Sequence, residues 1–144
     1  MTSGKQYTHY TGLKWFRFLV GFGFVTNMLL FALPALFTPR LLESLLNVGT
    51  TNTIQWLQNV GILLVIISVM YIPAIRDPFR YLFISFLLVA GRFSAGCLFL
   101  IGVLFIDYPD GMMALALNDL ILSSIQAVAL YFMLRDGDPR VGGA

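Results

Sequence analysis

The feature that most restricts the fold of this chain is a series of four long apolar runs. They cover approximately residues 15–37, 53–72, 81–106 and 112–134. A hydrocarbon core about 30 Å thick is crossed by about 20 helical residues, and each run has that length. A segment inside lipid must satisfy its backbone hydrogen bonds internally, so we expect each run to be a helix. The sequence therefore predicts an all-α membrane protein, a bundle of four transmembrane helices.

The composition supports this class and excludes several kinds of site. The chain is 58% hydrophobic and 11% charged, whereas a soluble domain has about 25% charged residues. The excess apolar surface must therefore face lipid. The only histidine is His9 and the only cysteine is Cys97, which excludes a His–Cys metal cluster, a haem held by two histidines and an internal disulfide. We expect no metal site, no covalently bound cofactor and no nucleic-acid partner.

The segments between the runs differ in kind. Residues 73–80 and 107–111 contain proline and charged side chains, and they predict short turns. The segment 38–52 is longer, and its Pro39 suits the first turn of a helix. It predicts a short amphipathic interfacial helix between helices 1 and 2, ended by Gly49 and residues 50–52. One face would carry Leu41, Leu42, Leu45 and Leu46, and the other Arg40, Glu43 and Ser44.

The distribution of Lys and Arg predicts the orientation. With helices at the four runs, seven cations fall on the side of the chain ends and one, Arg40, on the other. Cytoplasmic segments are rich in Lys and Arg, so we expect both termini in the cytoplasm. The predicted division is a cytoplasmic segment 1–14, a transmembrane domain 15–134 and a flexible cytoplasmic tail 135–144. The seven cations are Lys5, Lys14, Arg17, Arg76, Arg80, Arg135 and Arg140.

Two charged residues, Arg92 and Asp119, fall deep inside the predicted spans. Arg92 lies near the middle of the third run, about 20 Å from its outer end, and Asp119 lies about 10 Å below the same surface. A charge at the bilayer centre costs about 2.5–3.5 kcal/mol, and such residues usually face a bundle interior or a cavity. Gln126 shares the helix face of Asp119 and matches the depth of Arg92. These three side chains are the first candidates for a functional site.

Three amides extend the candidate cluster. Gln55 and Asn59 are four residues apart on the second run, and Asn59 matches the depth of Asp119. Asn27 on the first run falls between the depths of Arg92 and Asp119. We therefore predict a polar cluster that opens outward, with Arg92 at its floor. Its guanidinium could extend toward Asp119, or bond Gln126 and keep part of its fork for an anion, a carbonyl or a quinone oxygen.

Two interpretations of this cluster stay open. Arg92 and Asp119 could neutralise each other and lock the third helix to the fourth, with the amides forming hydrogen bonds between helices. Alternatively, the cluster could bind a ligand or move a proton, because intramembrane ionisable groups are usually functional. The two roles do not exclude each other.

Four short motifs of the chain are Pro34 with the stretch 38–48, Gln58-Asn59-Val60-Gly61, Gly91-Arg92, and Asp119. Together they resemble the motifs of the DoxX-like superfamily of small four-helix bacterial membrane proteins. The similarity covers about residues 15–134. It implies a bacterial inner (plasma) membrane location, and one branch of the superfamily is similar to the membrane subunit of thiosulfate:quinone oxidoreductase. It implies no catalytic residue set.

Three classes of function are compatible with these features. The first is a small accessory protein or subunit that binds a lipid, a quinone or partner helices, in a respiratory or redox assembly or as a homo-oligomer. The second is an enzyme or quinone-reactive subunit, in which Arg92 polarises a carbonyl and Asp119 transfers a proton. The third is a transporter, which would need several copies of so short a chain to form a pathway. The small soluble mass favours the first class.

Overall fold

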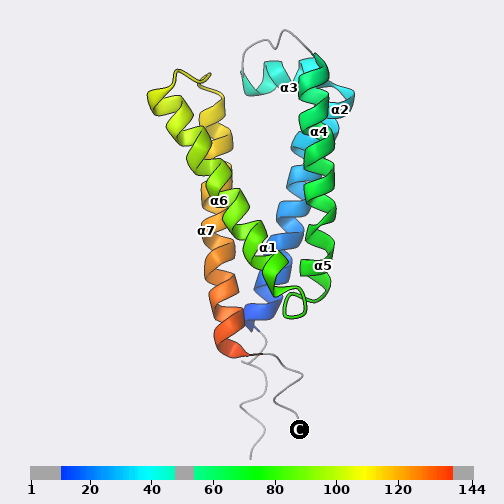
Figure 1. Cartoon of the computed structure of the whole chain (residues 1–144), viewed down its shortest axis with the longest axis vertical. Helices are drawn as coiled ribbons and strands as arrows, with labels where there is room; N and C mark the ends of the chain where they lie inside the picture. Colours follow the sequence, from blue (N-terminus) through cyan, green and yellow to red (C-terminus); the bar gives the residue numbers. More distant parts are fainter. Residues whose placement is uncertain (1–10, 48–53, 138–144) are drawn as a thin grey trace, which may run out of the picture.

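A computed structural model of the protein describes residues 11–47 and 54–137. Within these residues four helical stretches are long and apolar enough to cross a membrane, which confirms the predicted four-helix membrane fold. A short helix lies in the connection between the first and second stretches (Figure 1). The elements are α1 Thr11–Thr26, the π-helical segment η1 Asn27–Ala32, α2 Leu33–Phe37, α3 Pro39–Leu46, α4 Ile54–Val69, α5 Tyr71–Arg76, α6 Leu82–Phe105 and α7 Met112–Asp136.

The first span begins at Thr11, four residues before its predicted start, and contains the π-helical segment η1. At the end of η1 the Leu33 N–H donates to the carbonyl of Met28, five residues earlier. Pro34 follows directly. Proline has no N–H to continue the α-helical ladder, and its ring crowds the carbonyl four residues before it. The wider π turn therefore lets the helix pass through Pro34 and end at Phe37, before Pro39 starts α3.

The second span extends beyond its predicted end at residue 72. α4 ends at Val69, and α5 continues the span to Arg76, so the predicted turn 73–80 is wrong in its first four residues. Pro73 is tolerated in the first turn of α5, where its missing N–H removes no bond from a continuous helix. At the end of α5 the Arg17 Nη2 donates to the Arg76 carbonyl at 2.7 Å, which connects the second span to α1.

Helix α3 forms where the leucine pattern predicts it, but with a different buried face. Leu42 and Glu43 are buried, while Leu41 and Leu45 are exposed. The buried Glu43 carboxylate pairs with the Arg40 guanidinium at 2.9 Å, as a buried charge requires a partner. The helix ends at Leu46, before a left-handed Asn47 (φ 47°). The predicted end at Gly49 and residues 50–52 falls outside the described residues.

The third and fourth spans agree closely with the sequence. α6 covers Leu82–Phe105, one residue shorter at each end than predicted. α7 begins at Met112 as predicted and continues to Asp136, two residues into the segment 135–144 that was predicted to be flexible. The rest of that tail from residue 138, and residues 1–10 of the N-terminal segment, lie outside the described residues.

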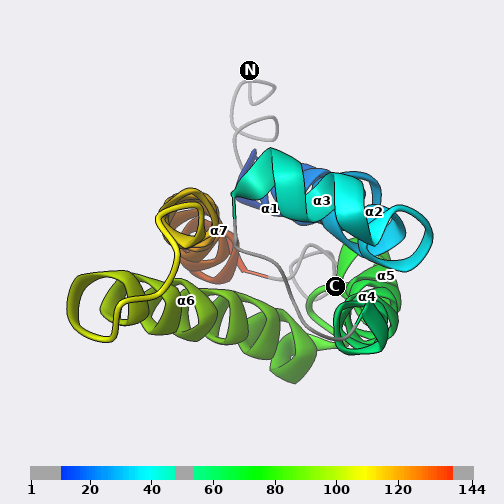
Figure 2. The same cartoon turned by 90° about the horizontal axis from the view of Figure 1, so that it is seen from above.

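The helices form two pairs that meet at one end and diverge at the other. α6 lies along α7, and α4 packs on η1 and α2 (Figures 1 and 2). The apolar core lies at the end where α1 begins, around Phe16, Val20, Tyr71, Ala74 and Met133. Toward the end with α3 the pairs separate. There the end of α3 contacts the turn between α6 and α7, because a Cβ at Gly111 in that turn would overlap the Leu46 carbonyl.

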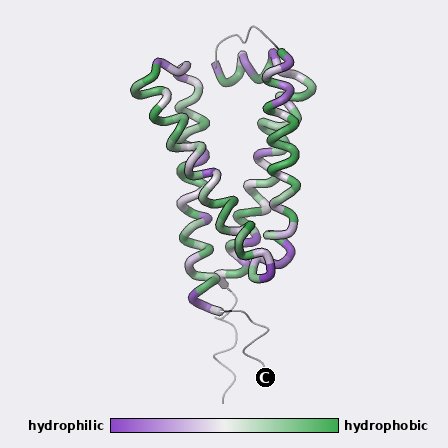
Figure 3. The backbone as a smooth tube through the Cα atoms, viewed as in Figure 1, coloured by the Kyte–Doolittle hydropathy of each residue, from purple (hydrophilic) through white to green (hydrophobic). Residues whose placement is uncertain are grey.

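Polar residues are concentrated at the ends of the helices, with a few in their middle (Figure 3). Apart from Arg92 in the middle of α6, the described cations lie at the two ends of the bundle. Arg40 belongs to the end with α3, and the others belong to the end where α1 begins and α7 finishes: Lys14, Arg17, Arg76, Arg80 and Arg135. This is the separation that the predicted orientation requires. That both termini face the cytoplasm stays a prediction.

Candidate functional site: a polar cluster beside an intramembrane cavity

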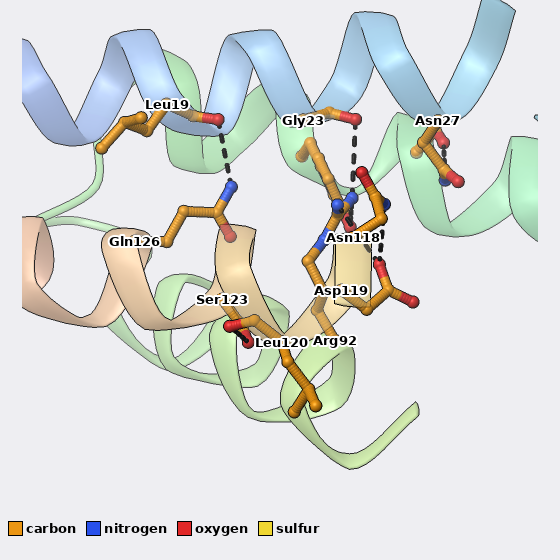
Figure 4. Close-up of polar contacts among 11 residues, drawn as sticks. Leu19, Gly23, Asn27, Arg92, Asn118, Asp119, Leu120, Ser123 and Gln126 are labelled. Atoms are coloured by element: carbon orange, nitrogen blue, oxygen red, sulfur yellow. Dashed lines mark hydrogen bonds and ion pairs between the residues drawn. The ribbon is translucent and has the colours of Figure 1, made fainter. Parts of the chain in front are cut away.

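Arg92 lies near the middle of α6, and only 8% of it is exposed. Its Nη1 pairs with Oδ1 of Asp119 on α7 at 3.4 Å. Its Nη2 donates to the Tyr71 hydroxyl at 3.2 Å and, in a longer contact of 3.5 Å, to the Gly23 carbonyl on α1. The guanidinium therefore connects α1, α5, α6 and α7, and Figure 4 shows it between Gly23 and Asp119. Of the two partners considered for Arg92 from the sequence, the structure has Asp119.

Two glycines allow this convergence. A Cβ at Gly96, one turn beyond Arg92, would lie 2.8 Å from the Leu120 side chain and 3.0 Å from its backbone nitrogen, so α6 approaches α7 closely beside Asp119. A Cβ at Gly23 would lie 3.0 Å from Gln126 Nε2 and 3.5 Å from Arg92 Nη2. A bare backbone at Gly23 thus leaves room for two polar side chains from other helices.

Gln126 lies at the same level as Arg92 but has a different partner from the one predicted. It is 2% exposed, and its Nε2 donates to the Leu19 carbonyl at 3.0 Å (Figure 4). The other alternative for Arg92, a hydrogen bond with Gln126, is therefore replaced by a bond from Gln126 to the α1 backbone. Because carbonyl oxygens have two lone pairs, a residue of α7 can bond α1 without disrupting its helix. Gln126 has a structural role at this point.

Of the three remaining candidates, only Asn27 joins the cluster. Its Nδ2 donates to the Ser68 hydroxyl at 2.7 Å, which ties the start of η1 to α4. Gln55 and Asn59 are exposed and do not line the cavity beside Arg92. The residue of their helix turn that faces the first span is Gln58, whose Nε2 donates to the Leu36 carbonyl at 3.2 Å. Sequence spacing gave the depth of Asn59 but not its direction.

A cavity of about 360 Å³ lies against this cluster. It is bounded by α4 and α5 on one side and by α6 on the other, where the two helix pairs begin to diverge. Its polar lining is Asn27, Tyr71, Arg92 and Asp119, and the rest is apolar. Ile67, Met70 and Leu87 are about half exposed, so the cavity opens sideways toward the surroundings of the bundle. The apolar lining is Leu64, Ile67, Met70, Ile84, Leu87, Leu88, Gly91 and Ala95.

The electrostatics of the cavity wall are those of a neutral but polar site. Arg92 and Asp119 carry opposite charges and lie next to each other, and Asn118 adds a contact to Asp119 Oδ1 at 3.4 Å. The contacts of Arg92 at 3.2–3.5 Å are longer than the 2.7–2.9 Å of strong charge-assisted hydrogen bonds. Its Nε takes part in none of these three contacts. The Asp119 side chain is 22% exposed.

Tyr71 and two backbone carbonyls belong to the site although sequence reasoning did not select them. The hydroxyl of Tyr71 bonds Arg92, and the Arg92 guanidinium lies 5.8 Å from the centre of the Tyr71 ring. A tyrosine near the end of an apolar run is typical of the membrane interface. Its real position is buried because the span continues to Arg76. The carbonyls of Leu19 and Gly23 carry no sequence signal as acceptors.

The described residues contain no group of three or more His, Cys, Asp or Glu side chains that could hold a metal ion. Comparison with known proteins gave no match to any family model, curated protein or solved structure. The resemblance to DoxX-like proteins therefore stays a prediction from short motifs. The site must be interpreted from its own geometry.

Proposed function

We propose that this four-span membrane protein is a non-enzymatic component of its membrane that binds a quinone in the cavity beside Arg92. One observation carries the proposal: a laterally open, mostly apolar cavity has in its wall, at mid-depth, an arginine whose contacts with Asp119, Tyr71 and Gly23 are 3.2–3.5 Å long. Three properties of the cavity favour a quinone over other membrane ligands, namely its size, its charge and its depth. We expect the protein to act within an assembly of membrane subunits or of copies of itself.

The size and lining of the cavity suit a small amphipathic molecule. Ligand sites usually have volumes of about 300–1,000 Å³, mostly apolar walls and a few polar groups. The cavity has about 360 Å³ and four polar lining residues at one region of its wall. A single ring with polar oxygens fits such a volume, and an apolar tail would leave between α4 and α6.

The charge of the wall favours a neutral ligand. Asp119 already balances the charge of Arg92 at 3.4 Å, so an anion would gain little net attraction and would face the carboxylate. A neutral carbonyl oxygen can accept an N–H of Arg92 without separating the ion pair. Quinones carry such oxygens on an otherwise apolar ring.

The depth of Arg92 argues against a phospholipid headgroup in this cavity. Arg92 is ten residues from Leu82 and thirteen from Phe105, so about 15 Å and 20 Å from the two ends of α6. Phospholipid headgroups stay at the surfaces of a hydrocarbon core about 30 Å thick. A lipid-soluble carbonyl compound has no such restriction.

A quinone-reactive subunit is the second candidate, because Asp119 lines the same cavity as Arg92. A carboxyl group there could deliver a proton to a quinone oxygen as it is reduced. Reduction to the quinol takes two electrons and two protons. The two electrons would have to come from a separate redox protein of the same assembly, and the second proton from water at the membrane surface. The two candidates share the binding step and differ in whether bound quinone is reduced.

Gly91 offers a direct test of the cavity. It lines the cavity, and a Cβ built there meets no atom within 4 Å. We expect Gly91→Leu to fill the space and raise the Kd for a short-chain ubiquinone analogue at least about tenfold, or about 1.4 kcal/mol. The Arg92–Asp119 pair should persist. The measurement is quenching of the fluorescence of Trp15 and Trp56, or equilibrium dialysis, in detergent micelles.

Gly21→Leu is the matched control, because a Cβ at Gly21 also meets nothing within 4 Å and Gly21 does not line the cavity. It adds the same side chain to another spanning helix and should bind the analogue as the unmodified protein does. Equal affinity in Gly91→Leu and Gly21→Leu would place the quinone elsewhere, and no measurable binding to the unmodified protein would refute the proposal.

A further inference from the structure

A second hollow, which shares no lining residue with the Arg92 cavity, extends between α1 and α7 from the start of α1 and the end of α7. Its volume is about 430 Å³, and α1 and α7 form its two walls. The helices touch beside it, because a Cβ at Gly12 would lie 2.6 Å from the Met133 backbone nitrogen. The hollow is therefore a groove along a close helix contact. Its apolar lining includes Leu19, Ile125 and Val128.

The groove has a charged end and an apolar end. At the charged end are Arg135, 60% exposed, and Asp136, whose Oδ1 lies 3.6 Å from Arg135 Nη2. Lys14 is exposed and lines an adjoining hollow that shares Thr11 and Trp15 with the groove. Together Lys14, Arg135 and Asp136 have a net charge of +1. The exposed indole of Trp15 lies beside them, as is usual at the headgroup level of a membrane.

The length of the groove matches one leaflet of a bilayer. From Arg135 to Ile125 there are ten residues of α7, or about 15 Å. This is half of a hydrocarbon core about 30 Å thick. A molecule with its charge at Lys14 and Arg135 would therefore lay an apolar chain of one leaflet's length against Ile125 and Val128. Free phosphate could contact the cations but would leave the apolar wall empty.

We propose that this groove binds an anionic phospholipid, with its phosphate at Lys14 and Arg135 and one acyl chain between α1 and α7. Basic side chains beside grooves between spanning helices are a recurrent recognition device for anionic lipid headgroups. The net positive charge favours an anionic headgroup over a zwitterionic one. The site is separate from the Arg92 cavity and does not depend on quinone binding.

The test is native mass spectrometry of the full chain, purified in detergent and incubated with equimolar phosphatidylglycerol and phosphatidylcholine. We expect the unmodified protein to retain phosphatidylglycerol preferentially. The double variant Lys14→Gln/Arg135→Gln should lose about 25-fold of that retention, because each cation near a membrane surface contributes about a factor of five. Arg76→Gln/Arg80→Gln, with the same change in charge at the same end, should behave as the unmodified protein does.

A second variant tests the acyl chain with all charges intact. Val128→Trp places a bulky ring on an exposed position of the groove wall, and it should also reduce phosphatidylglycerol retention. Equal retention of the two lipids by the unmodified protein would overturn the proposal. So would equal losses in the groove and control double variants, which would indicate general attraction to a basic surface. Full retention in Val128→Trp would exclude the acyl-chain contact that defines the site.

Discussion

Replacing Asp119 by leucine is expected to lower the free energy of unfolding by about 3–5 kcal/mol, because Arg92 would remain buried without its counter-charge. A guanidinium cannot lose its proton in a protein, so it cannot escape this cost by becoming neutral. The Tyr71 hydroxyl and the Gly23 carbonyl would still accept hydrogen bonds from it, but neither carries a charge. The measurement is unfolding in mixed micelles with increasing dodecyl sulfate, followed by tryptophan fluorescence.

Arg92→Leu should be less harmful than Asp119→Leu, because the carboxyl that remains can take up a proton. The double variant Arg92→Leu/Asp119→Leu should recover most of the lost stability, since apolar residues can replace an ion pair of this kind at little cost. It should nevertheless fail to bind the quinone analogue. Wild-type stability of Asp119→Leu would show that the pair contributes nothing to the fold, and wild-type quinone affinity of the double variant would remove Arg92 from the site.

The second large effect is expected at the contact of α1 with α7. A Cβ at Gly12 would lie 2.6 Å from the Met133 nitrogen and 2.7 Å from the Phe132 carbonyl carbon, both backbone atoms that cannot move aside alone. We expect Gly12→Val to destabilise the protein by about 1–3 kcal/mol, the usual cost of overpacking. The same unfolding titration measures it.

Gly21→Val is the control for Gly12→Val, because it introduces the same β-branched side chain into α1 at a position with open space. It should change the stability by only a few tenths of a kcal/mol, in line with helix propensity. If Gly12→Val and Gly21→Val unfold at the same fraction of dodecyl sulfate, the close approach of α1 to Met133 is not part of the folded protein.

The four spans could be predicted because lipid imposes a length and an apolar composition that the sequence shows directly. The interruptions within the first and second spans could not be predicted in this way. The π turn before Pro34 and the break at Met70 depend on how a helix adapts locally to proline, and hydropathy does not report this. Because the second span extends to Arg76, Tyr71 is buried in the core although it lies near the end of the predicted run 53–72.

Only part of the candidate site could be predicted, because the sequence shows the depth of a side chain in the membrane but not its direction. Depth along a helix follows from residue counting, so Arg92, Asp119 and Gln126 were placed at consistent levels. The direction in which a side chain points around the helix axis can be assigned only when the packed faces of the helices are known. Without that, Asn59 was expected inside and is exposed, and Gln126 was assigned to Arg92 but bonds the Leu19 carbonyl. Backbone acceptors are invisible in the sequence because every residue has one.

The most direct test of the quinone site is photolabelling of the purified protein with a short-chain ubiquinone analogue that carries a photoreactive group, followed by peptide mapping. The proposed function predicts labels on the cavity-lining parts of α4, α5 and α6, around residues 64–71 and 84–95, with loss of label when unmodified analogue competes. Label confined to other parts of the chain, or label that competition does not reduce, would contradict a quinone site beside Arg92.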